Sequence, residues 1–432
     1  MGTPCDDGGM SVSSASQYLP RAASQPVMDA LADTRVVLVN GARQSGKSTL
    51  VQRIGRQTGA AWYTLDDPAT RRHAAADPVG FVSLDDRMII DEIQREPGLL
   101  LAIKALVDQV PTPGRFLLTG SARVLGLRNL PDTLVGRMET IELWPLSQGE
   151  IDGRQDGFVD AAFAFGPDLR HESAVTRDEY IERLVRGGFP EAIRRPEARR
   201  TAFLTNYVAD LVNRDVLQLS EIERGPQMRA LIAALAGRSG QIIAPATLGS
   251  ALRLDNKTTA RYIGLAQEVF LIKRIPAWTR RVSARSTDQA KVAFVDSGIA
   301  AALLGQGVAR LRKPGAPLGG LLEGFVVMEI ARQLSWSRTD ATLSHFRTKD
   351  GLEVDAVLEN RLGQVVGIEV KASSTPVPSD FRGLRHLAER VGGDFLAGYM
   401  LHTGQQTLPA GPKMRAIPIA ALWETPTPSS PE

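Results

Sequence analysis

The length and composition of the chain predict a globular protein of several domains and exclude a small protein held together by disulfides. Of its 432 residues, 43% are hydrophobic and 23% are charged, so it can bury more than one core. The net charge of +3 is too small to indicate nucleic acid by itself. The only cysteine, Cys5, excludes a disulfide framework, and five histidines argue against a histidine-based metal site. Neither a long apolar run nor a signal-like N-terminus occurs, so we expect a cytoplasmic protein.

The N-terminal half predicts strands that alternate with helices. A disordered tail is expected over residues 1–17, and a short helix is expected around Gln25–Ala32. Hydrophobic runs that end in turn residues predict five strands, at 36–40, 61–65, 87–92, 115–121 and 139–143. Helical patterns such as Leu99–Val110 lie between them. This alternation predicts an α/β fold, in which a parallel sheet has helices on both faces.

A phosphate-binding loop is predicted where the first strand ends. Gly41 to Ser48 reads Gly-x-x-x-x-Gly-Lys-Ser, and a helix is expected from Thr49 to Arg56. Lys47 would reach the β- and γ-phosphates of ATP, and the Ser48 hydroxyl would ligate Mg²⁺. The residues expected to contact the nucleotide are Gly41, Ala42, Arg43, Gln44, Ser45, Gly46, Lys47, Ser48 and Thr49.

Acidic and polar residues follow two further strands at the same edge of the predicted sheet. Asp91 would hold Mg²⁺, and Glu92 would orient and deprotonate the attacking water. Thr119 or Ser121 could contact the γ-phosphate or that water as a sensor, or could simply cap a turn. Arg123 and Arg137 are candidates for an arginine that acts on the site of a neighbouring copy in a homo-oligomer, although a solvated surface accounts for them more simply in a chain this rich in arginine.

The middle of the chain predicts a loop followed by helices. Residues 151–171 are rich in Gly and Asp and predict a loop, whereas 179–186 and 199–219 have helical periodicity. The segments Thr247–Leu252 and Lys257–Glu268 resemble a helix-turn-helix, with a wing strand at 270–275.

A basic cluster follows this motif and suggests DNA as a partner. Its residues are Lys273, Arg274, Arg280, Arg281, Arg285 and Lys291, with Trp278 interleaved. Asn256, Lys257, Thr258 and Arg261 would face a DNA groove from the second helix. The alternative is that the winged helix packs on the ATP-binding domain as a lid.

Two alternating segments near the C-terminus predict a hairpin with a polar face. A loop at 361–363, with Gly363 in the left-handed conformation, pairs Asp355 with Glu369 and Glu353 with Lys371. This is the Asp…Glu-x-Lys arrangement of a metal-dependent phosphodiesterase, in which Asp355 and Glu369 would ligate Mg²⁺ and Lys371 would assist catalysis. Either Glu323 or Glu329 could complete the site. The alternative is a solvated hairpin face with a Glu353–Lys371 pair.

Several segments together resemble a known protein family, the AAA-type ATPases of bacteria and archaea that carry a C-terminal domain of unknown function. They are 41–48, 90–94, 118–121, 134–137, 186–190, 214–216, 262–271 and 346–355. The resemblance implies an ATPase module, a winged-helix segment and a restriction-endonuclease-like module. The expected domains are a tail at 1–17, the ATPase domain at 18–170, a helical lid at 171–225, a winged helix at 226–289, a nuclease-like domain at 290–424 and a tail at 425–432.

Two functional hypotheses follow from these residues. In the first, Mg²⁺-dependent ATP hydrolysis is coupled to DNA binding and to DNA processing by the nuclease-like domain. In the second, the protein is a nucleotide-dependent switch that binds a protein partner, and the nuclease fold is catalytically inactive.

Overall fold

The computed structural model describes residues 18–121, 134–216, 225–280 and 290–429. The predicted tail 1–17 therefore lies outside the described residues, as do Arg123, Arg281 and Arg285.

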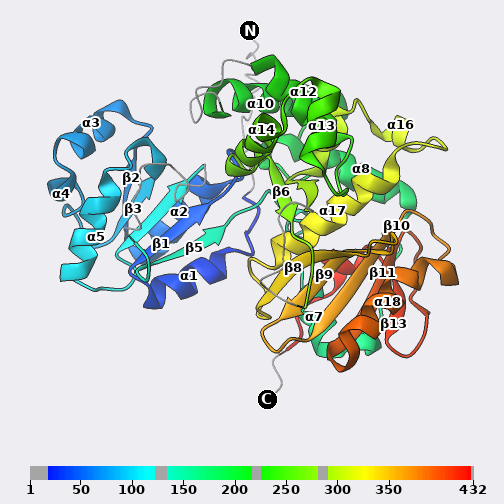
Figure 1. Ribbon diagram of the computed structural model, residues 1–432. Coiled ribbons are helices and arrows are strands. Elements are labelled where there is room, and N and C mark those ends of the chain that lie inside the picture. The colour runs from blue at the N-terminus through cyan, green and yellow to red at the C-terminus, as the bar shows by residue number, and fades with distance from the viewer. Residues whose placement is uncertain (1–17, 122–133, 217–224, 281–289, 430–432) are drawn as a thin grey trace, which may run out of the picture.

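The N-terminal sheet has five parallel strands in the order β2-β3-β4-β1-β5. They are β1 (Val36–Asn40), β2 (Ala61–Thr64), β3 (Met88–Asp91), β4 (Phe116–Gly120) and β5 (Met138–Glu142). The helices are α1 (Ser24–Asp33), α2 (Lys47–Thr58), α3 (Pro68–Ala76), α4 (Pro78–Phe81) and α5 (Leu99–Gln109). Alternate residues of β1 enter two separate cores, one with α1 and α2 and the other with α3 to α5, so helices cover both faces as predicted (Figure 1).

The segment after β5 is helical, which corrects the prediction of a loop over 151–171. It forms α6 (Gln148–Asp152), α7 (Phe158–Phe165) and the short 3₁₀ helix η3 (Gly166–Asp168). A capping box between Ser147 and Glu150 starts α6. In α7, Phe158, Val159, Ala161 and Ala162 are buried, so apolar packing determines its structure despite the Gly- and Asp-rich flanks.

Helices and a small hairpin occupy the middle of the chain. They are α8 (Arg177–Arg186), α9 (Pro190–Ile193), α10 (Glu197–Asp210), the π-helix η4 (Leu211–Val216), α12 (Gly225–Ala236), α13 (Pro245–Leu252) and α14 (Asn256–Glu268). The strands β6 (Ile272–Ile275) and β7 (Lys291–Phe294) pair antiparallel. We refer to residues 225–294 as the helix–hairpin segment.

The C-terminal part contains a six-stranded mixed sheet in the order β12-β13-β11-β10-β9-β8. Its strands are β8 (Ala341–Arg347), β9 (Glu353–Asn360), β10 (Val365–Lys371), β11 (Phe395–His402), β12 (Leu408–Pro409) and β13 (Met414–Pro418). The helices are α15 (Ser297–Leu303), α16 (Val308–Leu311), α17 (Leu318–Gln333), α18 (Arg382–Val391) and α19 (Ala421–Glu424).

The hairpin of β9 and β10 has the predicted register. Ile368 pairs with Ala356 and Gly367 with Val357, and Gly363 in the turn has φ of 77°. The ladder ends at Ile368, so the predicted pairs Asp355–Glu369 and Glu353–Lys371 lie beyond it. There the Val370 amide donates to the Asp355 carboxylate at 2.9 Å. The hairpin therefore opens where the predicted acidic residues lie.

Helix α17 lies against the C-terminal sheet and below the middle helices, and it contacts α7 and α8 as well as β9 and β10 (Figure 1). Its Arg332 guanidinium donates to Glu329 at 2.6 Å, to the Pro145 carbonyl at 2.9 Å and to the Val295 carbonyl at 2.8 Å. The second oxygen of Glu329 accepts from the Gln148 amide at 3.0 Å. Both side chains are buried, so this pair joins the end of the N-terminal sheet to the C-terminal part. No helix within the described ranges combines the length and apolarity needed to cross a membrane.

Replacing Arg332 should destabilise the protein strongly. The Arg332→Met variant leaves Glu329 buried without its counter-charge, which costs about 3–5 kcal/mol. We expect a much lower Tm in thermal unfolding followed by circular dichroism. The matched control is Arg312→Met, because Arg312 forms exposed ion pairs with Asp178 and Glu182 that contribute roughly 0–1 kcal/mol. Equal Tm values for the two variants would contradict this role for Arg332.

Candidate functional site

The predicted phosphate-binding loop lies between β1 and α2. Gly46 has φ of 97°, a conformation that favours glycine, and it caps the N-terminus of α2. A Cβ at Gly41 would lie 2.1 Å from the Leu143 carbonyl oxygen, so this position admits only glycine. The Lys47 ammonium donates to the carbonyls of Gly41 at 3.0 Å and Ala42 at 2.9 Å. Lys47 therefore lies within the concave side of the loop, where a phosphate chain would be held.

Two residues that the sequence analysis missed hold this loop from outside. The buried Arg21 side chain donates to the Ser45 carbonyl at 2.7 Å and to the Trp144 carbonyl at 2.6 Å, and it pairs with Glu150. The Tyr207 hydroxyl, from α10, donates to the Arg43 carbonyl at 3.2 Å. Neither residue belongs to a local motif, so their roles depend on contacts between distant segments.

Two strand ends and the start of α2 bring hydroxyl groups to Asp91. One oxygen of Asp91 accepts from Ser48 at 2.9 Å and from Thr119 at 2.6 Å. The other lies 3.4 Å from the Thr64 hydroxyl. Burial raises the pKa of Asp91, and the hydrogen bonds from Thr119 and Ser48 oppose this shift. Carboxylate and hydroxyl oxygens at the mouth of a phosphate-binding loop form the donor set that Mg²⁺ prefers, so these residues fit the predicted ion.

Glu92 follows Asp91 in a strained backbone conformation. Its φ of 60° is uncommon for a residue with a side chain, and its amide donates to the Thr119 hydroxyl at 2.9 Å. The carboxylate accepts from Ser121 at 2.9 Å and also contacts Gln94. Thr119 thus contacts Asp91, and Ser121 contacts Glu92, which brings both predicted sensor residues to the predicted acids.

One of the two candidates for an arginine that acts on a neighbouring copy, Arg137, lies in the described part of the chain. Arg137 precedes β5, at the edge of the sheet opposite the phosphate-binding loop, and it pairs with Asp108 of the same chain. Arg123 lies outside the described residues.

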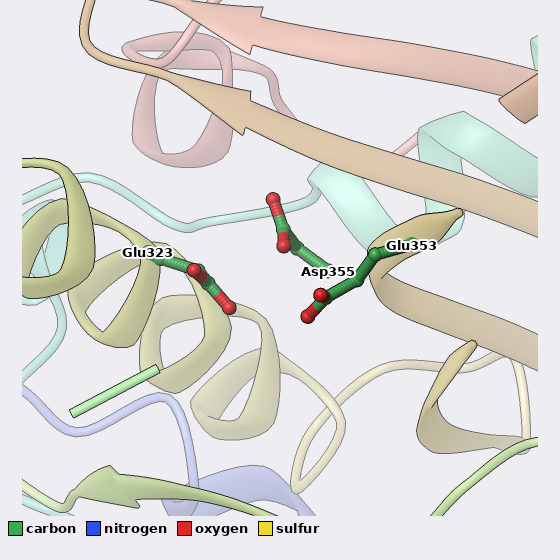
Figure 2. A group of neighbouring side chains, drawn as sticks. All are labelled: Glu323, Glu353 and Asp355. Carbon is green, nitrogen blue, oxygen red and sulfur yellow. The ribbon is translucent and has the colours of Figure 1, made fainter. Parts of the chain in front are cut away.

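A second cluster of acidic side chains lies between α17 and β9. Oxygen atoms of Glu323, Glu353 and Asp355 lie within 4.8 Å of one another. Figure 2 shows Glu323 pointing from its helix toward the two acids of β9. Glu353 and Asp355 lie on one face because they are two residues apart in a strand. Glu323, rather than Glu329, therefore joins this cluster, since Glu329 is held by Arg332.

Glu369 and Lys371 line the same cavity as these acids. The cavity has a volume of about 660 Å³, and its polar lining includes Arg347 and Arg382. Lys371 donates to one oxygen of Glu369 at 2.7 Å, and the other oxygen is buried without a hydrogen-bond partner. Burial and the nearby charge of Asp355 raise the pKa of Glu369 to about 8. An unpaired carboxylate oxygen beside a second carboxylate fits a bound divalent cation, as predicted for Asp355 and Glu369.

Lys291, which the sequence analysis placed in a DNA-binding surface, points into this cluster instead. It is only 1% exposed, and its ammonium contacts Glu323, Glu353 and Asp355. Burial lowers the pKa of Lys291, but the three acids outweigh that effect and raise it. The prediction that Lys291 contacts a phosphate backbone is wrong, because charge pattern alone does not reveal which side of a strand is buried.

Other members of the predicted basic cluster also have partners within the protein. Lys273 pairs with Glu142 at 3.7 Å, Arg280 pairs with Asp394 at 3.6 Å, and the buried Trp278 ring donates to Glu359. By contrast, Asn256, Lys257 and Arg261 of α14 are exposed.

Comparison with known protein families finds three matching regions along the chain. Residues 33–152 match an AAA domain, 177–309 match a domain of unknown function (DUF8612), and 318–422 match another (DUF4143). An uncharacterized protein of Mycobacterium tuberculosis is 27% identical over 410 residues, which cover 94% of this chain and 85% of that protein. One of Haemophilus influenzae is 24% identical over 319 residues, covering 69% of this chain and 74% of that protein.

Among solved structures, a Walker-type ATPase of Pyrococcus abyssi is similar with a TM-score of 0.41 and 12% identity, covering 65% of this chain and 94% of that chain. The matches to the AAA domain and to the C-terminal domain reproduce the order of modules found in the fold. The chain therefore contains an AAA domain of the P-loop ATPase type, followed in the C-terminal part by the domain of unknown function DUF4143.

Proposed function

We propose that this protein is a cytoplasmic, Mg²⁺-dependent ATPase that binds DNA and cleaves it at the C-terminal acidic site. The observation that carries the ATPase proposal is the convergence of Ser48 and Thr119 on Asp91, with Glu92 as the next residue. These groups surround the place where the phosphate-binding loop would present the γ-phosphate.

The residues around the phosphate-binding loop would have separate roles in ATP hydrolysis. Lys47 offsets the negative charge of the β- and γ-phosphates, and Ser48 and Asp91 would hold Mg²⁺, which offsets charge on the same oxygens. Glu92 takes a proton from a water molecule. The water oxygen bonds to the γ-phosphorus while the bond between the γ-phosphorus and the bridging β-phosphate oxygen breaks. Ser121 and Gln94 hold the Glu92 carboxylate in position.

A continuous set of contacts supports coupling between the ATP site and the C-terminal domain. The segment Leu143–Gln148 touches the phosphate-binding loop through the close approach of Leu143 to Gly41. Its carbonyls at Trp144 and Pro145 accept from Arg21 and Arg332, respectively. Arg332 lies on α17, the helix that also carries Glu323. A shift of the loop upon nucleotide binding would therefore move the helix that supplies one acid of the C-terminal site.

The order of elements in the C-terminal domain supports the nuclease proposal. Helix α17 precedes the antiparallel strands β8 to β10, and after α18 comes β11, which is parallel to β10. This arrangement brings Glu323 of α17 to the cavity that Asp355 of β9 and Glu369 of β10 also line. Asp355 and Glu369 would hold a divalent cation against the scissile phosphate, and Lys371 would orient the attacking water or offset charge on phosphorus. The exposed start of α14, with Lys257 and Arg261, would contact the DNA backbone.

The ATPase proposal is tested by Lys47→Ala and Glu92→Gln. Loss of a charged hydrogen bond of about 1.5–3 kcal/mol should weaken ATP binding by Lys47→Ala at least about tenfold in calorimetric titration. Glu92→Gln should retain ATP binding, while phosphate release falls by about 10²–10⁴-fold because the general base is absent. Phosphate release at the wild-type rate by both variants would refute the assigned site.

The role of Thr119 predicts a second kinetic effect. Thr119→Val removes the donor to Asp91 and the acceptor for the Glu92 amide, so kcat should fall by about 10–100-fold, the usual effect of losing such a supporting contact. The matched control is Thr64→Val, whose hydroxyl is 3.4 Å from Asp91 and should matter little. Similar kcat values for these two variants would show that Thr119 does not position the acids.

The nuclease proposal is tested with plasmid and oligonucleotide DNA, with Mg²⁺ or Mn²⁺ and with or without ATP. Wild type should cleave DNA, and Lys371→Ala should not, although both turn over ATP equally. Absence of cleavage by wild type, with ATP turnover intact, would instead favour the hypothesis of a nucleotide-dependent switch that binds a protein partner.

DNA binding is measured in the same preparations. The double variant Lys257→Ala/Arg261→Ala should bind an oligonucleotide more weakly, and its affinity should depend less steeply on salt concentration than that of wild type. An unchanged affinity would show that the exposed start of α14 does not contact DNA.

A further inference from the structure

The ammonium of Lys291 lies at the centre of the acidic cluster of the C-terminal domain. Its distances are 2.5 Å to Glu323, 2.6 Å to Glu353 and 2.8 Å to Asp355. A lysine ammonium has three N–H donors, and the three carboxylates can use all of them. Each N–H of the ammonium can therefore donate to a different carboxylate.

These carboxylates form the type of oxygen cage that divalent cations occupy in proteins. Their oxygens lie within 4.8 Å of one another, which suits a cation with ligand distances of about 2.0–2.6 Å. A divalent cation inside this cage would lie within contact distance of the Lys291 ammonium and would be strongly repelled by it. The cage can hold the ammonium or a metal ion, but not both.

The backbone of Lys291 is fixed on both sides. In the hairpin it pairs with Ile275 of β6, and on its other side it forms a bridge with Ile242. The neighbouring Val292 amide donates to the Gln241 carbonyl at 3.1 Å. The side chain is thus delivered to the cluster by the helix–hairpin segment, whereas the acids come from α17 and β9.

We propose that Lys291 is a built-in cation that occupies the cage of Glu323, Glu353 and Asp355. Divalent metal is consequently restricted to the Asp355–Glu369 side, where one oxygen of Glu369 has no partner. This restriction rests on the proposed cation site at Asp355 and Glu369, but not on DNA cleavage. Many phosphodiesterases clamp the phosphate between two metal ions, and here the Lys291 ammonium takes the place of one of them.

The test is the number of Mn²⁺ ions bound per chain, measured with the full-length protein in the absence of nucleotide. Calorimetric titration and electron paramagnetic resonance of free Mn²⁺ both report this number. Lys291→Met should bind one more Mn²⁺ than wild type, and Mn²⁺ should raise the Tm of this variant more than that of wild type. Adding Glu323→Gln to Lys291→Met should remove the extra ion.

A second variant guards against misfolding, because Lys291→Met removes the ammonium that three carboxylates share, although Glu353 still pairs with Arg347 at 3.5 Å. Lys291→Met/Glu353→Gln has one carboxylate fewer and should still bind the extra Mn²⁺, although more weakly. No extra ion in either variant would overturn the proposal, as would loss of a Mn²⁺ ion from wild type upon Glu323→Gln alone.

A different result would refute the cation site on which the proposed nuclease function depends. Glu369→Gln should remove one Mn²⁺ from wild type, and absence of this effect would refute the Asp355–Glu369 site while leaving the occupancy of the cage by Lys291 supported. Conversely, wild-type cleavage of DNA together with an unchanged Mn²⁺ count in Lys291→Met would refute the role of Lys291 alone.

Discussion

The buried pair of Glu329 and Arg332 is the interaction on which the arrangement of this protein depends. Removing two charges from water is costly, and the structure compensates with directional hydrogen bonds rather than with the ion pair alone. Glu329 accepts from Arg332 and from the Gln148 amide, and Arg332 also reaches two carbonyls from different segments. Because hydrogen bonds have a preferred geometry, they fix the position of α17 relative to residues 145–148, the segment that follows β5.

Helix α17 carries two glutamates that have different roles. Glu323 and Glu329 are six positions apart, so at about 100° per residue they point in different directions and cannot serve one site. Glu323 faces the cavity and the acids of β9, whereas Glu329 faces Gln148 at the start of α6. One rigid element thereby relates the position of an acidic site to the segment that touches the phosphate-binding loop.

The sequence predicted the parts of this structure that depend on neighbouring residues. The phosphate-binding loop, the five parallel strands and the register of the β9–β10 hairpin each follow from a local pattern, and the fold confirms them. Lys291 and Arg21 were not understood from the sequence, because their partners are distant in the chain and a buried lysine looks like an exposed one in a list of charges. Helix α7 was missed because glycine and aspartate near its ends concealed four buried apolar residues.

The position of α19 has a consequence for the order in which the protein folds during synthesis. Trp423 is fully buried and stacks edge-on against Tyr180 and Phe325, and the Ala420 amide donates to the Tyr180 hydroxyl across 240 residues. Helix α8 therefore emerges from the ribosome long before the residues that cover it. The N-terminal sheet closes on its own neighbours and can form early, and α15 and α17 can cover part of α8, but the Tyr180 end of α8 stays uncovered until translation has passed Trp423. In that interval the apolar surface around Tyr180 is exposed on the nascent chain, and exposed apolar surface of this kind promotes aggregation.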